Sequence, residues 1–175
     1  CDAFKRGWRR AHPGISSYWK ELADTVREAI ANPGVTLTAR KLKVRRDGNW
    51  LRVALPSGRA LCYPAPRVEP DNTITYMGVD QYTKQWKRLK SYGGKFFENI
   101  CQAGSRDVLS FNMPAIEAAQ YAIVMHVHDE VVTEAPDSSE FNPDHLGGLL
   151  AANPPWAAGM PLAAGGFEAY RYRKD

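Results

Sequence analysis

The chain has 175 residues, about the size of one domain, and its 44% hydrophobic and 24% charged residues exclude disordered, collagen-like and coiled-coil proteins. No apolar run approaches the roughly 18 residues that span a bilayer and no signal-peptide pattern opens the chain, so we expect a soluble, intracellular protein without a membrane partner. The net charge of +4 divides into +10 over residues 1–100 (19 basic minus 9 acidic) and −6 over residues 101–175 (4 minus 10). The basic first part could face a polyanion and the acidic second part could hold cations. The alternative is that both are ordinary solvated surfaces, which would give the same charge counts.

The start of the chain and its cysteines add two expectations. The chain begins with Cys1 rather than Met, in what the pattern indicates is the interior of a helix, so we expect a piece of a larger protein. Cys1, Cys62 and Cys101 are an odd number without CxxC spacing, which argues against a disulfide framework and against a structural zinc site. A reduced cytoplasmic setting is the simplest interpretation.

The first half of the chain predicts a helix and then antiparallel strands. Apolar residues three and four apart predict a helix over 15–31, which Asn32-Pro33-Gly34 ends. Between residues 35 and 64 the period changes to two, with a tight turn at Pro56-Ser57-Gly58, so we expect a hairpin or a small antiparallel meander. One more strand is expected at 73–77, before a basic and aromatic stretch over 81–90 to which the pattern assigns no element.

The second half predicts a long helix and a hairpin. Gly93-Gly94 opens a helix that runs to about residue 119, with Pro114 as a kink or break. Two apolar strands, 121–127 and 131–135, are joined by a tight polar turn that places carboxylates at the hairpin tip. A short helix at 144–151 and a final strand at 162–170 complete the chain, and without repeats or a low-complexity linker we expect one α+β unit.

The candidate site is the segment from His126 to Glu130. Two adjacent carboxylates at the end of a strand expected to be buried are costly unless a cation or hydrogen bonds compensate them. Neighbouring strand residues point to opposite faces, so at most one of Asp129 and Glu130 is expected to be a primary metal ligand. Carboxylate oxygens on a firm hairpin suit Mg²⁺, which keeps most of its waters and is usually shared with substrate phosphates. The alternative is an ordinary solvated turn.

The same segment leaves a zinc hydrolase open. His126 and His128 are two apart on a strand and would share one face, as in the HxH of metal-dependent hydrolases, and imidazole binds zinc. The HxHxDH pattern of that class departs from this sequence after His128, and only His12 and His145 remain elsewhere as further histidines. Ligands for such a centre therefore run short.

Residues 123–134 resemble motif C of the family A DNA polymerases, the bacterial polymerase I-like and bacteriophage-type enzymes. The shared pattern is a hydrophobic strand, then V-H-D-E, then a hydrophobic strand that ends in an acidic residue. The resemblance continues in chain order over nearly the whole sequence. Residues 10–15 are similar to the segment after the fingers helix, 55–64 to a P-S-G-R-x-L-x-Y-P hairpin, 93–109 to the palm helix before motif C, and 161–174 to the C-terminal strand.

The resemblance implies an α+β fold in which an antiparallel palm sheet packs against a long helix, with additional helices. Residues 1–175 would form the C-terminal part of the polymerase domain, in a bacterial cytoplasm or a phage-infected host cell. The intact enzyme would use two Mg²⁺ ions to add deoxynucleoside triphosphates to the primer 3′-hydroxyl on a DNA template. Nothing here resembles motif A, D-Y-S-x-I-E, which supplies the second metal aspartate, or the triphosphate-binding motif B, R-x₃-K-x₇-Y-G. We therefore expect the fragment alone to be inactive or nearly so.

The same resemblance implies residue roles at the hairpin. Asp129 would be the metal ligand, Glu130 an outer-shell acid, and His128 a contact to the primer terminus. These three residues are the expected catalytic group.

The implied DNA contacts lie elsewhere in the chain. Gln102, with Asn99 or Arg106, would touch primer–template DNA in the minor groove, where similarly placed acceptors allow base pairing to be checked without reading sequence. Phosphate contacts are implied at six basic residues, each of which could also be a solvated surface charge: Arg59, Lys84, Lys87, Arg88, Lys90 and Lys95. The alternative from another class is a non-catalytic nucleic-acid-binding module or polymerase remnant that uses the basic half on DNA.

Overall fold

The computed structural model describes residues 2–173, so Cys1 and Lys174 of the sequence patterns lie outside the described residues. The chain divides into two compact units with the boundary between Ala103 and Gly104, where the sequence had indicated one. Each unit is described by itself. The mixture of helices and antiparallel sheets confirms the α+β class.

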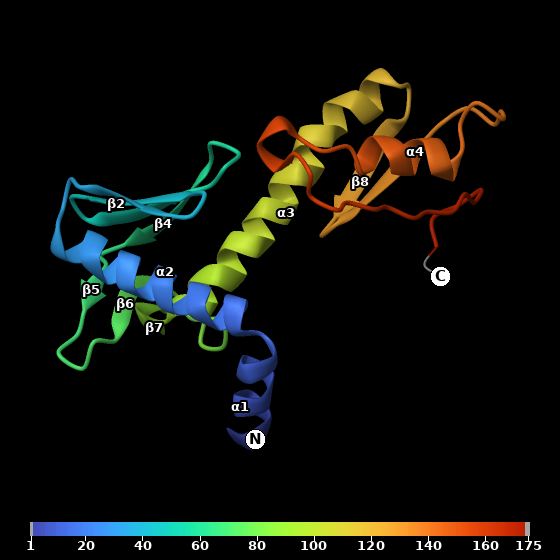
Figure 1. Ribbon diagram of the computed structural model, residues 1–175. Coiled ribbons are helices and arrows are strands. Elements are labelled where there is room, and N and C mark those ends of the chain that lie inside the picture. The colour runs from blue at the N-terminus through green and yellow to red at the C-terminus, as the bar shows by residue number, and fades with distance from the viewer. Residues whose placement is uncertain (1, 174–175) are drawn as a thin grey trace. The chain divides into compact units, whose positions relative to one another are not determined.

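The first unit holds two helices, seven strands and the start of a third helix (Figure 1). Its elements are α1 (Asp2–Ala11), α2 (Pro13–Ala31), β1 (Thr36–Ala39), β2 (Leu42–Asp47), β3 (Trp50–Ala54), β4 (Ala60–Pro64), β5 (Arg67–Val68), β6 (Ile74–Val79), β7 (Trp86–Ser91) and the beginning of α3 (Gly93–Ala118). The helix expected at 15–31 is confirmed and begins two residues earlier, because Pro13 fits the first helical turn.

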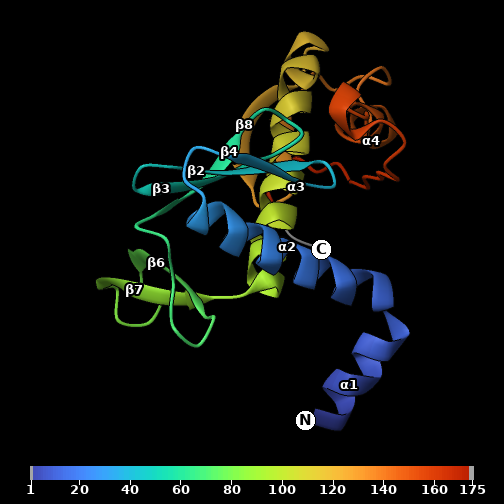
Figure 2. The same ribbon diagram turned by 60° about the vertical axis from the view of Figure 1, so that its left-hand side comes forward.

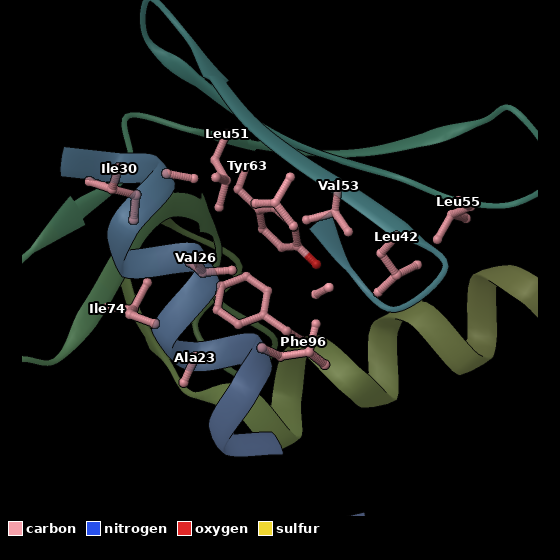
Figure 3. Packing of buried hydrophobic residues seen from close by; sticks show 14 of the residues in the cluster. Ala23, Val26, Ile30, Leu42, Leu51, Val53, Leu55, Tyr63, Ile74 and Phe96 are labelled. Atoms are coloured by element: carbon pink, nitrogen blue, oxygen red, sulfur yellow. The ribbon is translucent and has the colours of Figure 1, made fainter. Parts of the chain in front are cut away.

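Helix α2 and strands β1 to β4 enclose the core of this unit. The four strands form an antiparallel meander in the order β1-β2-β3-β4, as the period of two predicted. Leu22 and Val26 of α2 are fully buried, and Val44, Leu51 and Val53 point at them from β2 and β3. Figure 3 shows Val26, Leu51 and Val53 between the helix and the sheet, with the ring of Tyr63 among them. The apolar face of each element is thereby removed from water.

A second antiparallel sheet, in the order β5-β6-β7, lies on the other side of α2 (Figure 2). This sheet shares no strand pairing with the β1–β4 sheet. Pairing breaks between β4 and β5 because Pro64 and Pro66 flank Ala65, whose φ of 47° is outside the strand region. Strand β7 occupies the basic stretch to which the sequence pattern assigned no element.

Helix α3 enters the core of the first unit through Phe96. The Phe96 ring is buried and meets the Tyr63 ring edge-on, with centroids 5.0 Å apart and planes at 77°. One turn earlier the helix starts at Gly93, where an added Cβ would lie 1.8 Å from the carbonyl oxygen of Trp19. The backbones of α2 and α3 can approach this closely only because residue 93 has no side chain.

The second unit contains the rest of α3, the hairpin β8 (Ala122–Val127) and β9 (Glu130–Glu134), α4 (Pro143–Leu150) and the short 3₁₀ helix η1 (Pro155–Ala157). Asn112 is buried and donates to the carbonyl oxygens of Leu150 and Ala152, at 2.8 and 2.9 Å, which ties α3 to the end of α4. Asn142 caps α4 by accepting the backbone N–H of His145 at 2.9 Å.

One expectation for the second unit is wrong, and the break that was one of two alternatives at Pro114 is not formed. Helix α3 continues through Pro114 to Ala118 without a break. The final strand expected at 162–170 is absent, since no helix or strand is formed between η1 and residue 173. That segment contains Gly165-Gly166 and no β-branched residue from 160 to 170, so it lacks the side chains that stabilise strand pairing.

None of the helices formed by residues 2–173 is long and apolar enough to cross a membrane.

Two glycines of α3 give opposite predictions for the same substitution. We expect Gly93→Ala to lower the free energy of unfolding by roughly 3 kcal/mol or more, because the methyl group of the new alanine would overlap the carbonyl oxygen of Trp19. Gly104→Ala meets no atom within 4 Å and should raise it by roughly 0.5–1 kcal/mol through helix propensity. Urea denaturation of both variants measures the two effects, and equal shifts would contradict the close approach.

Candidate functional site

The candidate catalytic segment forms a two-residue turn at the tip of the β8–β9 hairpin. Val127 pairs with Glu130, so His128 and Asp129 alone connect the strands. Tyr121 anchors the entry to β8: it is buried, and its hydroxyl accepts the backbone N–H of Asn142 at 3.1 Å. The predicted hairpin is confirmed, with the carboxylates at its tip.

The turn holds His128 in the left-handed backbone region, with φ of 54°. This region costs a residue with a side chain about 1–2 kcal/mol, although histidine tolerates it better than most. Asp129 follows directly and is exposed, while Glu130 is half-buried at the start of β9. The two carboxylates therefore differ in their surroundings, and Asp129 is the one open to a ligand.

Strand β8 is not buried, contrary to the expectation from its apolar sequence. Val124 is 54% exposed and Met125 38% exposed. The hairpin is a two-stranded sheet, so within the described residues no further strand pairs with it. The backbone N–H of Ile123 is instead satisfied by the Glu117 carboxylate at 2.7 Å. The carboxylates at the tip consequently bear no large desolvation cost that a cation would have to offset.

The two histidines of the HxH pattern are held differently. His128 lies in the turn, so the strand alternation that would place it on the face of His126 ends at Val127. His126 contacts Arg106, with Nη1 3.3 Å from Nδ1 and Nη2 3.4 Å from Nε2. A guanidinium beside the ring disfavours a second cation there. These contacts argue against the zinc centre.

The donor set fits one partly hydrated Mg²⁺ better than two ions. Among residues 2–173, no three His, Cys, Asp or Glu side chains lie close enough together to hold a metal ion. Asp129 can offer carboxylate oxygens to an ion that takes its other ligands from water and substrate. A two-ion site would require a carboxylate from outside this group.

The expected minor-groove contacts fall at different places on α3. Asn99 donates from Nδ2 to the Tyr63 hydroxyl at 3.1 Å, and burial raises the pKa of Tyr63 to about 12. Gln102, one turn later, is exposed. Arg106 makes the contact with His126 described above, within the second unit. The Asn99 side chain is therefore held by the core, whereas Gln102 points to solvent.

Two of the expected phosphate contacts already donate to the protein backbone. Arg59 Nη2 donates to the carbonyl oxygen of Ala103 at 2.9 Å. Arg88 Nη1 donates to the carbonyl oxygen of Ala65 at 3.0 Å and to Thr75 Oγ1 at 3.1 Å. Both guanidinium groups thus support the fold of the first unit.

The four lysines are more accessible. Lys95 pairs with Glu98 at 3.0 Å, a hydrogen bond that raises the pKa of the lysine. Lys84, Lys87 and Lys90 are exposed on the β6–β7 hairpin, where Lys87 lies 3.1 Å from the Asp80 carboxylate. Lys84 and Lys87 lie at or beside the tip of this hairpin, which a polyanion could approach, whereas Lys90 pairs with Thr75 toward its other end.

The β6–β7 turn is organised by Asp80. Its carboxylate accepts the backbone N–H of Thr83 at 2.8 Å and the hydroxyl of the same residue at 2.9 Å. The Thr83 N–H and then the Lys87 hydrogen bond lower the pKa of Asp80 to about 2. The turn presents Tyr82, which is 93% exposed, beside Lys84 with φ of 56°. Tyr82 is not among the contacts expected from the sequence, although its place within a basic stretch is visible there.

The comparisons with known proteins found one informative similarity. The chain is 35% identical over 175 residues to a DNA polymerase of Bacillus phage SP02, a match that covers 97% of this chain and 27% of that polymerase. The chain thus spans about a quarter of the length of this relative. No protein-family model matches the chain, and no solved structure matches it.

The backbone strain at His128 gives a prediction with a matched control. His128→Gly should stabilise the hairpin by up to about 1 kcal/mol, because glycine adopts positive φ without steric cost. His126→Gly, two residues earlier inside β8, should instead destabilise it by roughly 0.5–1 kcal/mol. Hydrogen exchange of the β8 and β9 amides measures both, and a loss of protection in the His128 variant would argue against the left-handed turn.

Proposed function

We propose that this chain is the C-terminal palm portion of a family A DNA polymerase domain, extending over residues 1–175. The observation that carries the proposal is the V-H-D-E sequence at the tip of a two-residue hairpin turn, in a chain similar along its length to a phage DNA polymerase. The intact enzyme would add deoxynucleotides to a primer on a DNA template. It would work in a bacterial cytoplasm or in a phage-infected host cell.

Asp129 is the proposed Mg²⁺ ligand. Its exposure at the end of a two-residue turn leaves the carboxylate oxygens accessible to an ion. The bound ions would supply activation of the primer 3′-hydroxyl and charge stabilisation at the leaving pyrophosphate. Glu130 would orient water around the metal from its half-buried place, and His128 would contact the primer terminus.

The proposed DNA contacts divide according to how each side chain is held. Gln102 is exposed and can reach the minor groove, with Asn99 fixed one turn before it and Arg106 one turn after it on α3. Lys84, Lys87 and Lys95 would contact phosphates with flexible ammonium groups. Arg59 and Arg88 would do so only with donors not already given to the backbone.

The fragment alone is proposed to lack activity. A single exposed aspartate cannot hold two Mg²⁺ ions, and the residues described contain no group of three metal-ligating side chains to complete the site.

The alternative function is a non-catalytic nucleic-acid-binding module. The observation that favours it is the basic and aromatic β6–β7 hairpin, which needs no metal to attract DNA.

Metal binding by the chain as it stands separates these two functions. With Mn²⁺ replacing Mg²⁺, we expect paramagnetic broadening of amide signals centred on residues 128–130. Asp129→Asn should reduce the affinity for Mn²⁺ by roughly 10- to 100-fold or more. Loss of a residue that only supports a metal ligand already costs roughly that much, and Asp129 is proposed to be the ligand itself. Asp137→Asn, in an exposed acidic loop of the same unit, is the control. Broadening centred on residues 137–140 and unaffected by Asp129→Asn would overturn the proposed ligand.

Primer extension tests the proposed inactivity. With primer–template DNA, deoxynucleoside triphosphates and Mg²⁺, we expect no product from this chain, because residues 2–173 form no group of three metal-ligating side chains and the sequence has no counterpart of motif B. Robust extension that Asp129→Ala abolishes would show instead that the fragment is a complete enzyme.

A further inference from the structure

The outward face of the β1–β4 sheet is basic, although none of its residues belongs to the expected DNA contacts. Because strand residues alternate, the buried Leu42, Val44, Leu51 and Val53 define the inward face that α2 covers. Figure 3 shows three of them, Leu42, Leu51 and Val53. The opposite face is exposed to solvent. It carries Lys43 and Arg45 from β2 and Trp50 and Arg52 from β3, with Asp47 as its one acid.

Register places two arginines directly opposite each other on this face. Arg45 of β2 pairs with Arg52 of β3 as Cα partners. Like charges at such positions destabilise a sheet, so a face that served only to be solvated would be more stable without this pair. Asp47 compensates part of the repulsion, with Oδ1 2.5 Å from Arg45 Nε and Oδ2 3.8 Å from Arg52 Nη1. Three cations against one carboxylate leave the face at +2.

The positions of the charges argue against protection of a sheet edge as their purpose. Lysine and arginine often blunt exposed edge strands. Here β1 and β4 are the edges, and the cations lie on the central strands β2 and β3. The edge strands contribute small uncharged side chains to the same face: Thr36, Thr38, Ala60 and Cys62. A chain with regularly spaced anions could lie against this floor of small residues.

Trp50 adds a stacking surface beside the cations. It begins β3, two residues from Arg52 on the same face and therefore about 6.6 Å along the strand. Its side chain is 45% exposed, a costly position for an indole without a partner. An aromatic ring next to positive charges on an open surface is the combination that recognises unpaired bases on a phosphate backbone.

We propose that the outward face of the β1–β4 sheet binds single-stranded DNA, with Arg45, Arg52 and Lys43 contacting phosphates and Trp50 stacking on one base. A duplex fits less well, because its bases are stacked on one another and cannot lie on the indole. The proposed surface includes none of the residues of the β8–β9 hairpin and none of the DNA contacts considered above. The inference therefore goes beyond the proposed function and holds without metal at Asp129.

Binding of a labelled thymidylate oligonucleotide of about ten residues to the whole chain tests this surface. Fluorescence anisotropy in the presence of EDTA keeps the result independent of any metal site. We expect Trp50→Ala to weaken binding roughly 5- to 150-fold. The double variant Arg45→Gln/Arg52→Gln should reduce the slope of log affinity against log salt by about 0.7 for each phosphate that the two arginines neutralise.

Matched variants control for charge and for aromatic area. Lys5→Gln/Lys20→Gln removes two cations from α1 and α2, away from the outward face, and Phe4→Ala removes an exposed ring from α1. Both should bind within about twofold of the unaltered chain. If the double arginine variant fails to fold by circular dichroism, Lys43→Gln on the same face carries the salt test. Unchanged affinity in the Trp50 and charge variants, equal competition by duplex DNA, or no binding by the unaltered chain would overturn the proposal.

Discussion

The contact between the backbone of Gly93 and the carbonyl group of Trp19 determines where α3 leaves the core of the first unit. A side chain at residue 93 would occupy the space of that carbonyl oxygen, so the close approach of the two helices depends on glycine. Phe96 then falls against Tyr63, and Asn99, one turn later, donates to the hydroxyl of the same tyrosine. The buried aromatic pair thus fixes the rotation of α3 about its axis. Because Gln102 follows at the next turn, the placement of the exposed minor-groove candidate depends on the same contact.

Local periodicity was sufficient to predict the elements that bury one face against a neighbour close in sequence. Helix α2 and the β1–β4 meander are of this kind, whereas the β8–β9 hairpin was predicted from two apolar runs joined by a polar turn. Strand β7 was not predicted, because lysines and an arginine occupy both of its faces and hide the alternation. Its Arg88 is accommodated by oxygens of Ala65 and Thr75, 23 and 13 positions away, which no local pattern reveals. The wrong final strand had the opposite cause: apolar residues recur there, but no β-branched residue and no partner strand supports pairing.

The site was predictable in its local geometry and not in its surroundings. Polar residues between two apolar strands predicted a turn over residues 128–130, and the structure confines it to His128 and Asp129 because Glu130 already pairs with Val127. Whether β8 is buried depends on which other segments pack against it, and the sequence of the strand does not determine this. Within the described residues β8 pairs only with β9, and its side chains remain exposed. The sequence also did not show which basic residues already donate hydrogen bonds within the protein. The carbonyl group that accepts from Arg59, for example, belongs to Ala103, 44 positions further along the chain. Only the assembled fold distinguishes these structural arginines from the exposed lysines.

The boundary between the two units coincides with the reversal of charge along the chain. Residues 101–103 are uncharged, so the first unit carries the full +10 and the second the full −6. Phosphates would be attracted to the first unit and repelled by the second, in which Asp129 lies. A reaction at Asp129 on a phosphate-bearing substrate therefore needs cations to offset this repulsion, which is the part that Mg²⁺ would play. The cations of the β2–β3 face and the lysines of the β6–β7 hairpin, by contrast, need no metal to attract a polyanion. On electrostatic grounds, attraction of a polyanion and binding of a cation at Asp129 are separable, since the first depends on the charges of one unit and the second on a carboxylate of the other.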